Sequence, residues 1–271
     1  AADVQFGREP GSVQILPVSK TRPAEDIASV ADLAIGQLAE KKTGPAFGEN
    51  YLQEAVEKIE ALAERNLQWH FIGPIQSNKT AQIAQYFDWV HSVDRMKIAQ
   101  RLNDQRPAEL PPLNICLQVN VSGEASKSGI ILDELPALAE KIAQLPRLRL
   151  RGLMAIPAAS ADPMAQREAF HEVREAFNLL KKSQHKEQHW DTLSMGMTND
   201  MEAAIAGDRP HLLVGASELG AGRRRKAEAH RSGTTRRNPV AVRRRQTELG
   251  SPHLILSHLC GYDGIPPRKP A

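Results

Sequence analysis

The sequence lacks several features that mark common protein classes. Only two cysteines occur in 271 residues, which excludes a disulfide-rich scaffold and predicts a protein of the reducing cytoplasm. No apolar run approaches the ~20 residues of a membrane-spanning helix, and the first ten residues show no signal-peptide pattern. Apolar residues make up 41% and charged residues 25%, as in ordinary globular proteins. We therefore expect a folded cytoplasmic protein with no membrane partner.

The net charge of +3 conceals two regions of opposite sign. Residues 1–206 contain 22 basic and 27 acidic side chains, a net charge of −5, whereas residues 207–271 contain 13 and 5, a net charge of +8. The C-terminal region also has arginine clusters and no sustained apolar period. We therefore predict a globular domain over residues 1–217 and a divergent basic tail over residues 218–271.

Three explanations of the tail remain open. It is a disordered appendage, the product of a frame error near residue 207, or an arm that binds nucleic acid. Arginine clusters bind phosphate backbones through charge. However, Tyr262 is the only aromatic residue of the tail, so stacking on bases is poorly supported and nucleic acid is the least favoured partner.

The globular region alternates short apolar runs with amphipathic segments. Runs rich in β-branched residues predict buried strands, and apolar residues three and four apart predict helices. The predicted strands are 13–19, 45–50, 67–73, 89–93, 113–121, 148–156, 191–197 and 211–217. The predicted helices are 23–41, 51–65, 77–87, 94–105, 132–145, 165–182 and 198–206. This alternation indicates a parallel α/β fold, either a closed barrel or an open doubly wound sheet.

The end of the first predicted strand separates these two folds. A doubly wound nucleotide-binding fold usually carries G-x-G-x-x-G there, but this strand ends in SKTRP. Eight strands without that pattern favour a (β/α)8 TIM barrel. In such barrels the chemistry lies at the C-terminal ends of the strands, and phosphate groups often bind after strands seven and eight.

Polar residues at these strand ends are the candidate site. Lys20 follows the first strand, where desolvation makes a lysine amine nucleophilic and able to form a Schiff base with an aldehyde. The alternative is a lysine whose charged end reaches water at the strand end. Glu49 and Asn50, after the second strand, face the barrel mouth or cap the next helix.

Two other candidates have simpler explanations. His70, in the third predicted strand, has no second His, Cys or carboxylate at metal-ligand spacing. It is therefore interpreted as a structural histidine, and no metal site is predicted. Lys127, in the loop after the fifth strand, fits an ordinary solvated loop lysine on the active face.

The ends of strands seven and eight suggest an anion site. Ser194 and Gly196 lie between a strand and a helix start, where glycine lets backbone N–H groups approach an anion. Gly215 lies at the end of the eighth strand. An aldehyde-reactive Lys20 opposite a phosphate cradle suggests pyridoxal 5′-phosphate (PLP) as the cofactor.

Seven segments carry a resemblance to a known family. The chain resembles the pyridoxal-phosphate homeostasis proteins, whose bacterial members are often called the YggS family. The resemblance covers almost all of residues 11–206, and the segments occur in the family's order. They are SKTRPAEDI (19–27), FGENYLQEA (47–55), WHFIGPIQSNKT (69–80), HSVDR (91–95), QVNVSGEASKSGI (118–130), LRGLMAI (150–156) and LSMGMTNDMEAAIA (193–206).

The resemblance implies a fold like the N-terminal barrel of alanine racemase, without its β-domain. It assigns Lys20 to the Schiff base with PLP, Asn50 to the cofactor pocket, and Ser194 and Gly196 to the phosphate loop. Lys127 is implied as a secondary cofactor contact.

The same resemblance implies a monomer that buffers PLP or delivers it to apo-enzymes, without turnover. The alternative is a PLP-dependent racemase or decarboxylase. A racemase needs proton donors on both faces of its substrate. In alanine racemases a tyrosine from a dimer partner serves the second face, and that dimer needs the β-domain.

The chain departs from the family pattern at both ends. Only the last part of the helix that precedes the first strand is expected here. The family usually shows Arg two positions before a Gly-Thr pair, whereas this chain has Leu213 and Ala216 there. Gly215 still offers a backbone N–H. Losing one charged hydrogen bond costs about 1.5–3 kcal/mol, so we expect weaker cofactor retention.

Overall fold

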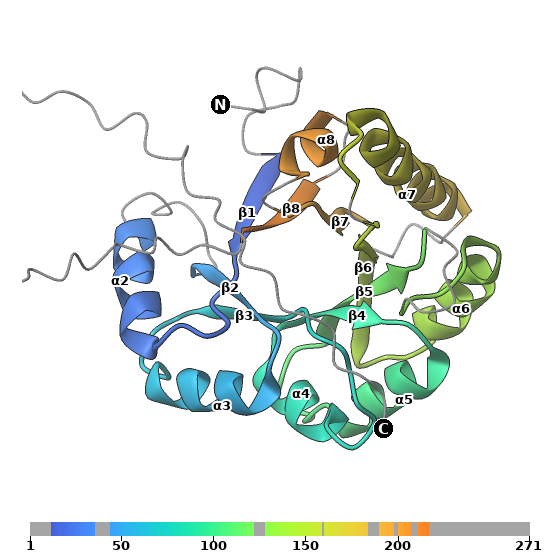
Figure 1. Cartoon of the computed structure of the whole chain (residues 1–271). Coiled ribbons are helices and arrows are strands. Elements are labelled where there is room, and N and C mark those ends of the chain that lie inside the picture. Colours follow the sequence, from blue (N-terminus) through green and yellow to red (C-terminus); the bar gives the residue numbers. More distant parts are fainter. Residues whose placement is uncertain are drawn as a thin grey trace, which may run out of the picture. The chain divides into compact units, whose positions relative to one another are not determined.

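Eight strands and seven helices alternate along the part of the chain that the structure describes (Figure 1). This computed structural model describes residues 12–35, 44–121, 128–158, 160–183, 190–197, 200–206 and 211–216, the last of these by backbone alone. The strands are β1 (Val13–Pro17), β2 (Ala46–Glu49), β3 (Gln68–Phe71), β4 (Trp89–Val93), β5 (Leu113–Val119), β6 (Leu148–Ala155), β7 (Thr192–Met195) and β8 (His211–Ala216).

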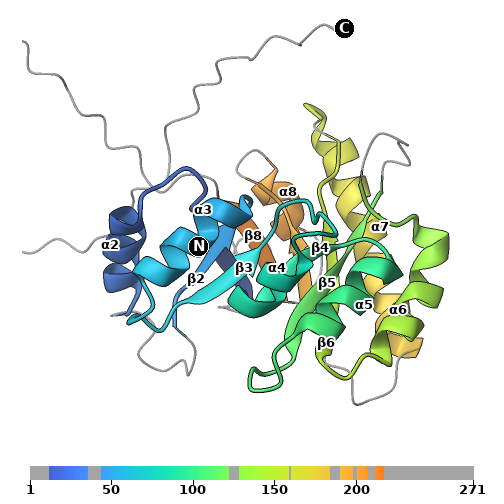
Figure 2. The same ribbon diagram turned by 90° about the horizontal axis from the view of Figure 1, so that it is seen from below.

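The helices lie outside the ring of strands, as the view turned by 90° also shows (Figure 2). None of the described helices is long and apolar enough to cross a membrane. The helices are α2 (Ala24–Ile35), α3 (Leu52–Ala61), α4 (Thr80–Tyr86), α5 (Met96–Gln105), α6 (Leu135–Ala143), α7 (Pro163–Ser183) and α8 (Met201–Ala206).

The strands form one parallel sheet that curls into a barrel. Its order is β1-β8-β7-β6-β5-β4-β3-β2, and β8 pairs with both β1 and β7. A parallel bridge between Val18 and Gly48 joins the two ends of the sheet. There the Ser19 N–H donates a 2.9 Å hydrogen bond to the Gly48 carbonyl oxygen. The predicted (β/α)8 barrel is therefore confirmed.

The main apolar core lies between the sheet and the helices. Every second residue of each strand faces outward, which puts Phe47 of β2 and Phe71 of β3 against the helices. Phe177 of α7 belongs to the same core. All three are at most 2% exposed, and burying each stabilises the fold by about 1.5–3 kcal/mol.

The inner face of the barrel is more polar. A small cluster of Trp89, Cys116 and Met154 lies there, with His70 stacked on the Trp89 ring at a centroid distance of 5.3 Å. Cys116 is fully buried and free, and burial raises the pKa of its thiol. The barrel interior therefore holds aromatic, sulfur-containing and polar side chains, whereas aliphatic and other aromatic side chains pack outside it.

The predicted element types are confirmed, whereas several boundaries differ. The helix expected from Ser77 begins at Thr80, after a turn in which the Lys79 N–H bonds to the Gln76 carbonyl. Helix α3 ends at Ala61, four residues earlier than expected. Helix α7 begins at Pro163, because proline is well suited to a first helical turn. The predicted tail, Cys260 and the residues before Ser12 lie outside the described residues.

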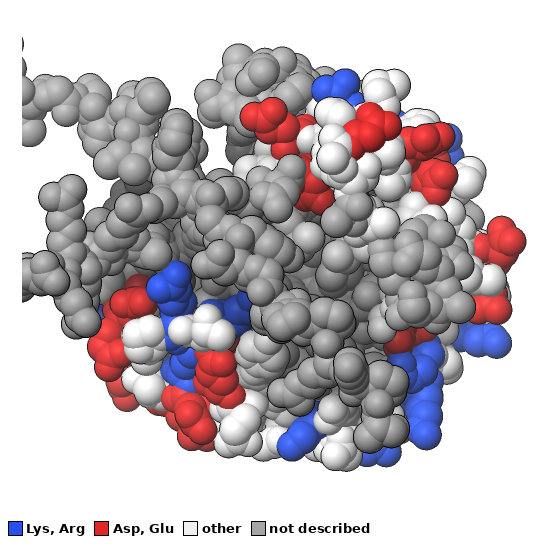
Figure 3. All heavy atoms as spheres, viewed as in Figure 1, with Lys and Arg blue, Asp and Glu red and all other residues white. Residues whose placement is uncertain are grey.

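The described surface carries charges of both signs. In the view of Figure 3, acidic side chains gather over α7 and α8, and basic ones lie toward α5 and α6. Helix α7 contains Glu168, Glu172 and Glu175, all of them exposed or half-buried. The described part of this face thus offers no continuous basic surface for a polyanion.

The close approach of β6 to β7 generates a stability prediction. A Cβ atom at Gly152 would lie 1.8 Å from the Thr192 carbonyl oxygen, a backbone atom that has no room to move. We expect Gly152→Ala to lower the free energy of unfolding by more than about 2 kcal/mol in denaturant titrations. Arg149→Ala, at an exposed position of the same strand, is the matched control and should change it by less than about 0.5 kcal/mol. Equal unfolding midpoints for the two variants would contradict the prediction.

Candidate functional site

Lys20 lies at the C-terminal end of the barrel, two residues after the bridge that closes it. Its half-buried side chain lines a cavity of about 120 Å³. No described residue gives its ammonium group a hydrogen bond or an ion pair. Asn50, Ser194 and Gly196 line the same cavity, among apolar side chains. The structure thus brings together four of the residues that the sequence singled out.

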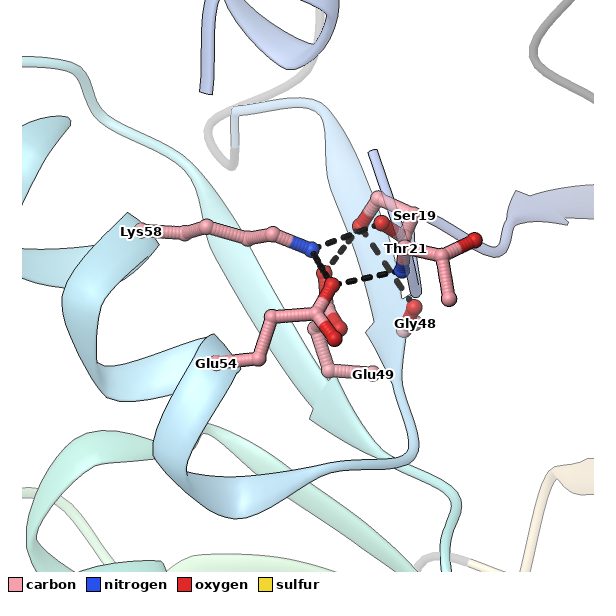
Figure 4. A network of polar contacts seen from close by, with 6 residues as sticks. All are labelled: Ser19, Thr21, Gly48, Glu49, Glu54 and Lys58. Atoms are coloured by element: carbon pink, nitrogen blue, oxygen red, sulfur yellow. Dashed lines mark hydrogen bonds and ion pairs between the residues drawn. The ribbon is translucent and has the colours of Figure 1, made fainter. Parts of the chain in front are cut away.

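The two neighbours of Lys20 are held from the opposite side of the strand (Figure 4). The Ser19 hydroxyl donates to the Glu49 carboxylate at 2.7 Å, and the Ser19 carbonyl accepts a 2.7 Å bond from Lys58 Nζ. The Thr21 N–H donates to the Glu54 carboxylate. Lys20 and Thr21 form a turn in which the Arg22 N–H donates a 3.0 Å hydrogen bond to the Ser19 carbonyl. These bonds therefore fix the backbone while the Lys20 side chain remains on the cavity side.

Thr21 adopts a strained backbone conformation. Its φ of 63° is in the left-handed region, which costs a β-branched residue about 1–3 kcal/mol. The surroundings must hold such a conformation in place, and the hydrogen bond to Glu54 of α3 does so. The chain consequently turns sharply away from the barrel directly after Lys20.

A buried ion pair is the centre of this network. Lys58 Nζ lies 2.7 Å from the Glu49 carboxylate, and the two residues are 6% and 0% exposed. Burial raises the pKa of Glu49, whereas the hydrogen bonds from Lys58 and Ser19 act in the opposite direction. Lys58 Nζ also lies 2.5 Å from the half-buried Glu54 carboxylate, so Lys58 has two acidic partners and Glu49 has one basic partner. A charged Glu49 without Lys58 would be strongly destabilising at this depth.

Asn50 forms a second wall of the cavity. Its side-chain oxygen is buried and has no hydrogen-bond partner among the described residues. A Cβ atom at Gly73 would lie 2.1 Å from the Asn50 carbonyl oxygen, so glycine is what lets the ends of β2 and β3 approach. An unpartnered acceptor at a cavity wall is suited to a hydrogen-bond donor of a ligand.

The loop after β7 has the form expected of an anion site. Ser194 is half-buried, and Gly196 has a φ of 88°, which glycine adopts without strain. The Asp200 carboxylate accepts the Met197 N–H and so folds the loop toward α8. In the neighbouring strand, Gly215 pairs by backbone with Leu16 of β1.

Some expectations about single residues change. Glu49 neither faces the barrel mouth nor caps α3, because it points away from the cavity to Lys58; Asn50 does not cap α3 either, since Tyr51 is its N-cap residue and makes no side-chain cap bond. Lys127 lies outside the described residues. Among the described residues, no group of three potential metal ligands occurs.

No sequence pattern singled out Lys58, Glu54, Asp200 or His91. Lys58 and Glu54 belong to an amphipathic helix and look like ordinary surface charges. His91 lies in a predicted strand, two residues after Trp89. Because side chains two residues apart on a strand point to the same face, this spacing was the available signal that His91 faces the interior together with Trp89. His70 is 2% exposed and hydrogen-bonded, in agreement with the structural interpretation.

The buried pair generates a prediction about stability. We expect Lys58→Met to lower the free energy of unfolding by about 3–5 kcal/mol, because it leaves Glu49 charged or forces it to bind a proton. Adding Glu49→Gln should recover part of this loss in the double variant.

The matched control is Arg65→Met, which removes an ion pair to the exposed Asp32. It should cost less than about 1 kcal/mol in the same denaturant titrations. If Lys58→Met proved as mild as Arg65→Met, the buried pair would not have the role described.

Comparisons with known proteins place this chain in a family. The sequence pattern of the alanine racemase N-terminal domain matches residues 11–213. The pyridoxal phosphate homeostasis protein of Pseudomonas aeruginosa is 56% identical over 215 residues, which cover 79% of this chain and 87% of that protein. The protein of the same name from Escherichia coli is 50% identical over 224 residues, covering 82% and 91%.

Solved structures give the same result. PipY of Synechococcus elongatus, determined with PLP bound, is 31% identical with a TM-score of 0.64, covering 78% of this chain and 94% of PipY. Alanine racemase of Clostridium difficile has a TM-score of 0.56 at 13% identity, covering 80% and 54%, and shares the fold alone. By its sequence and its barrel, the chain described here belongs to the pyridoxal phosphate homeostasis protein family.

Proposed function

We propose that this protein binds PLP covalently through Lys20 and takes part in intracellular vitamin B6 homeostasis by buffering or delivering the cofactor. One observation carries the proposal: the Lys20 amine lines the same cavity as the Ser194–Gly196 loop. The names of the curated relatives and the PLP bound to PipY support it.

The described residues fit the chemical groups of PLP. Lys20 offers an amine that no described residue engages, and PLP carries an aldehyde. Asn50 offers an unpartnered buried oxygen at the cavity wall. Ser194, the backbone of Gly196 and the N–H groups of that loop suit a phosphate. Lys127 and Gly215 belong to the same proposal as further contacts.

PLP supplies the aldehyde, and the protein supplies the nucleophile and its position. Lys20 would hold the cofactor as the nucleophile for that aldehyde, in a reversible condensation that would release one water. Because water reverses this step, the same lysine can release the cofactor. The network around Ser19 and Thr21 would keep the backbone of Lys20 in place both when the cofactor attaches and when it leaves.

We also propose that the protein does not turn over amino acids. Lys20 and Asp200 are the titratable side chains among the described residues that line the cavity, and Asp200 already accepts the Met197 N–H. Tyr51 and Tyr86, the tyrosines of the described part, do not line it. A racemase-like second acid is therefore missing from the described wall. The proposed setting is a cytoplasmic monomer that passes PLP to apo-enzymes.

Removal of Lys20 tests the proposal. We expect Lys20→Ala to lose the visible absorbance of the Schiff base and the covalent label left after borohydride reduction in the presence of PLP. Lys97→Ala, at an exposed position of α5, is the matched control and should keep both signals. A covalent PLP label that persists in Lys20→Ala would refute the assignment of this lysine.

The departure from the family pattern in β8 generates a second test. Leu213 is the backbone neighbour of Ser194 in β7, so its position adjoins the proposed phosphate loop. By the resemblance, arginine at this position approaches the pyridine nitrogen. We expect Leu213→Arg to tighten PLP binding about tenfold or more, whereas Leu213→Met should leave the affinity unchanged. Equal affinities of the two variants, measured by absorbance titration, would show that Leu213 does not limit retention.

A further inference from the structure

A row of hydrogen-bonded side chains runs through the barrel interior from the cavity. Ser194 Oγ of β7 lies 2.7 Å from His91 Nδ1 of β4. His91 Nε2 lies 2.9 Å from His70 Nδ1 of β3, and His70 Nε2 lies 3.2 Å from the side-chain oxygen of Gln68. Ser194 lines the cavity, and Gln68 begins β3 at the other end of the barrel. We call these four residues the interior chain.

Both histidines of the interior chain are neutral at physiological pH. They are 2% and 0% exposed, and burial lowers the pKa of His91 to about 3. Burial also lowers the pKa of His70 well below its usual range, helped by His91 and by the positive charge of Arg151. A neutral imidazole has one donor and one acceptor nitrogen. The interior chain therefore has only two directions in which all its bonds are satisfied.

The orientation of Gln68 selects the first direction. Its carbonyl oxygen faces His70, so His70 Nε2–H donates and His70 Nδ1 accepts. His91 Nε2–H then donates to His70, and His91 Nδ1 accepts the Ser194 hydroxyl proton. In this direction Ser194 turns its oxygen lone pairs, and not its proton, toward the cavity.

A phosphate dianion requires the second direction. It has acceptors only, so Ser194 must donate its hydroxyl proton into the cavity. His91 must then donate from Nδ1 and His70 from Nδ1, and the Gln68 amide must present its NH₂ group to His70. Donation from His91 to Ser194 also polarises the hydroxyl and makes it a stronger donor.

We infer that the interior chain positions the Ser194 hydroxyl, and that a bound phosphoester reverses the donor-to-acceptor direction of every hydrogen bond in the interior chain. Each ring carries one proton in both directions, on Nε2 in the first and on Nδ1 in the second. Ser194 passes its proton to His91 Nδ1, His91 passes its Nε2 proton to His70 Nδ1, and His70 releases its Nε2 proton at the half-buried Gln68 end. Ser194 takes a new proton from the cavity. The number of protons is conserved. This inference rests on the proposed function, since it assumes that the phosphate of PLP lies beside Ser194.

The tautomers of His70 and His91 test the inference directly. Long-range ¹H–¹⁵N correlation spectra of the full-length protein distinguish histidine rings protonated at Nε2 from those protonated at Nδ1. We expect both rings in the Nε2–H form without ligand and in the Nδ1–H form at saturating PLP. Pyridoxal, which has the aldehyde but no phosphate, should leave both rings unchanged. His70→Gln and His91→Gln identify the two signals among the nine histidines.

A pair of substitutions at Gln68 gives a second test that does not depend on those histidine variants. Gln68→Glu places a group that only accepts beside His70, and so holds the chain in the first direction. It should weaken PLP binding about tenfold or more, the equivalent of one hydrogen bond to a charged group. Gln68→Met favours neither direction of the interior chain, so it should weaken PLP binding clearly less than Gln68→Glu does. Pyridoxal affinity should be the same in both variants.

Ser194→Ala separates the interior chain from a through-space effect of the new charge. In that background Gln68→Glu should no longer change PLP affinity, because no hydroxyl remains to be oriented. The same loss with and without Ser194 would overturn the inference, as would unchanged tautomers at PLP saturation. Absorbance titration of the unsubstituted protein monitors PLP attachment separately, so a failure of the proposed function appears as no binding in any sample.

Discussion

The buried contact between Lys58 and Glu49 is the constraint on which the site depends. It lies between α3 and the strands, outside the barrel wall, and it ties together the ends of β1 and β2 where the ring closes. Neither residue lines the cavity, yet their bonds to Ser19 fix the backbone from which Lys20 projects. Lys20, the lysine proposed to bind PLP, is thus positioned by side chains that lie on the opposite side of the barrel wall from the cavity.

The barrel divides its residues according to the two-residue repeat of its strands. Outward positions carry the aliphatic and phenylalanine side chains that hold the helices, as Val90 and Leu117 do. Inward positions carry polar and aromatic side chains, including an Arg151 guanidinium 4.5 Å from the centre of the Trp89 ring. Arg151 is also paired with Asp191 and bonded to Asn114, so its charge is compensated within the interior. Stability is supplied mainly by the outer layer, and the inner layer is free to hold groups that serve a ligand.

The alternation of strands and helices was predictable because burial imposes a period on each segment. Lys20, Asn50, Ser194 and Gly196 could be predicted as neighbours because parallel strands of a barrel end at the same face. Lys58 could not be assigned to Ser19, since a charged residue on an amphipathic helix has the same pattern whether it meets water or a buried carboxylate. His91 had no distinguishing local signal for a bond to Ser194, because that contact joins strands 103 residues apart.

The ion pair of Lys58 and Glu49 also limits how this sequence can change. Loss of Lys58 leaves the buried Glu49 carboxylate without its charge partner, whereas loss of Glu49 leaves the Lys58 ammonium group with Glu54 and the Ser19 backbone carbonyl only. Few single substitutions at Lys58 or Glu49 would therefore leave the stability of the protein unchanged. Across descendants of one ancestor, these residues should persist together or be replaced together, even where the surface of α3 drifts freely.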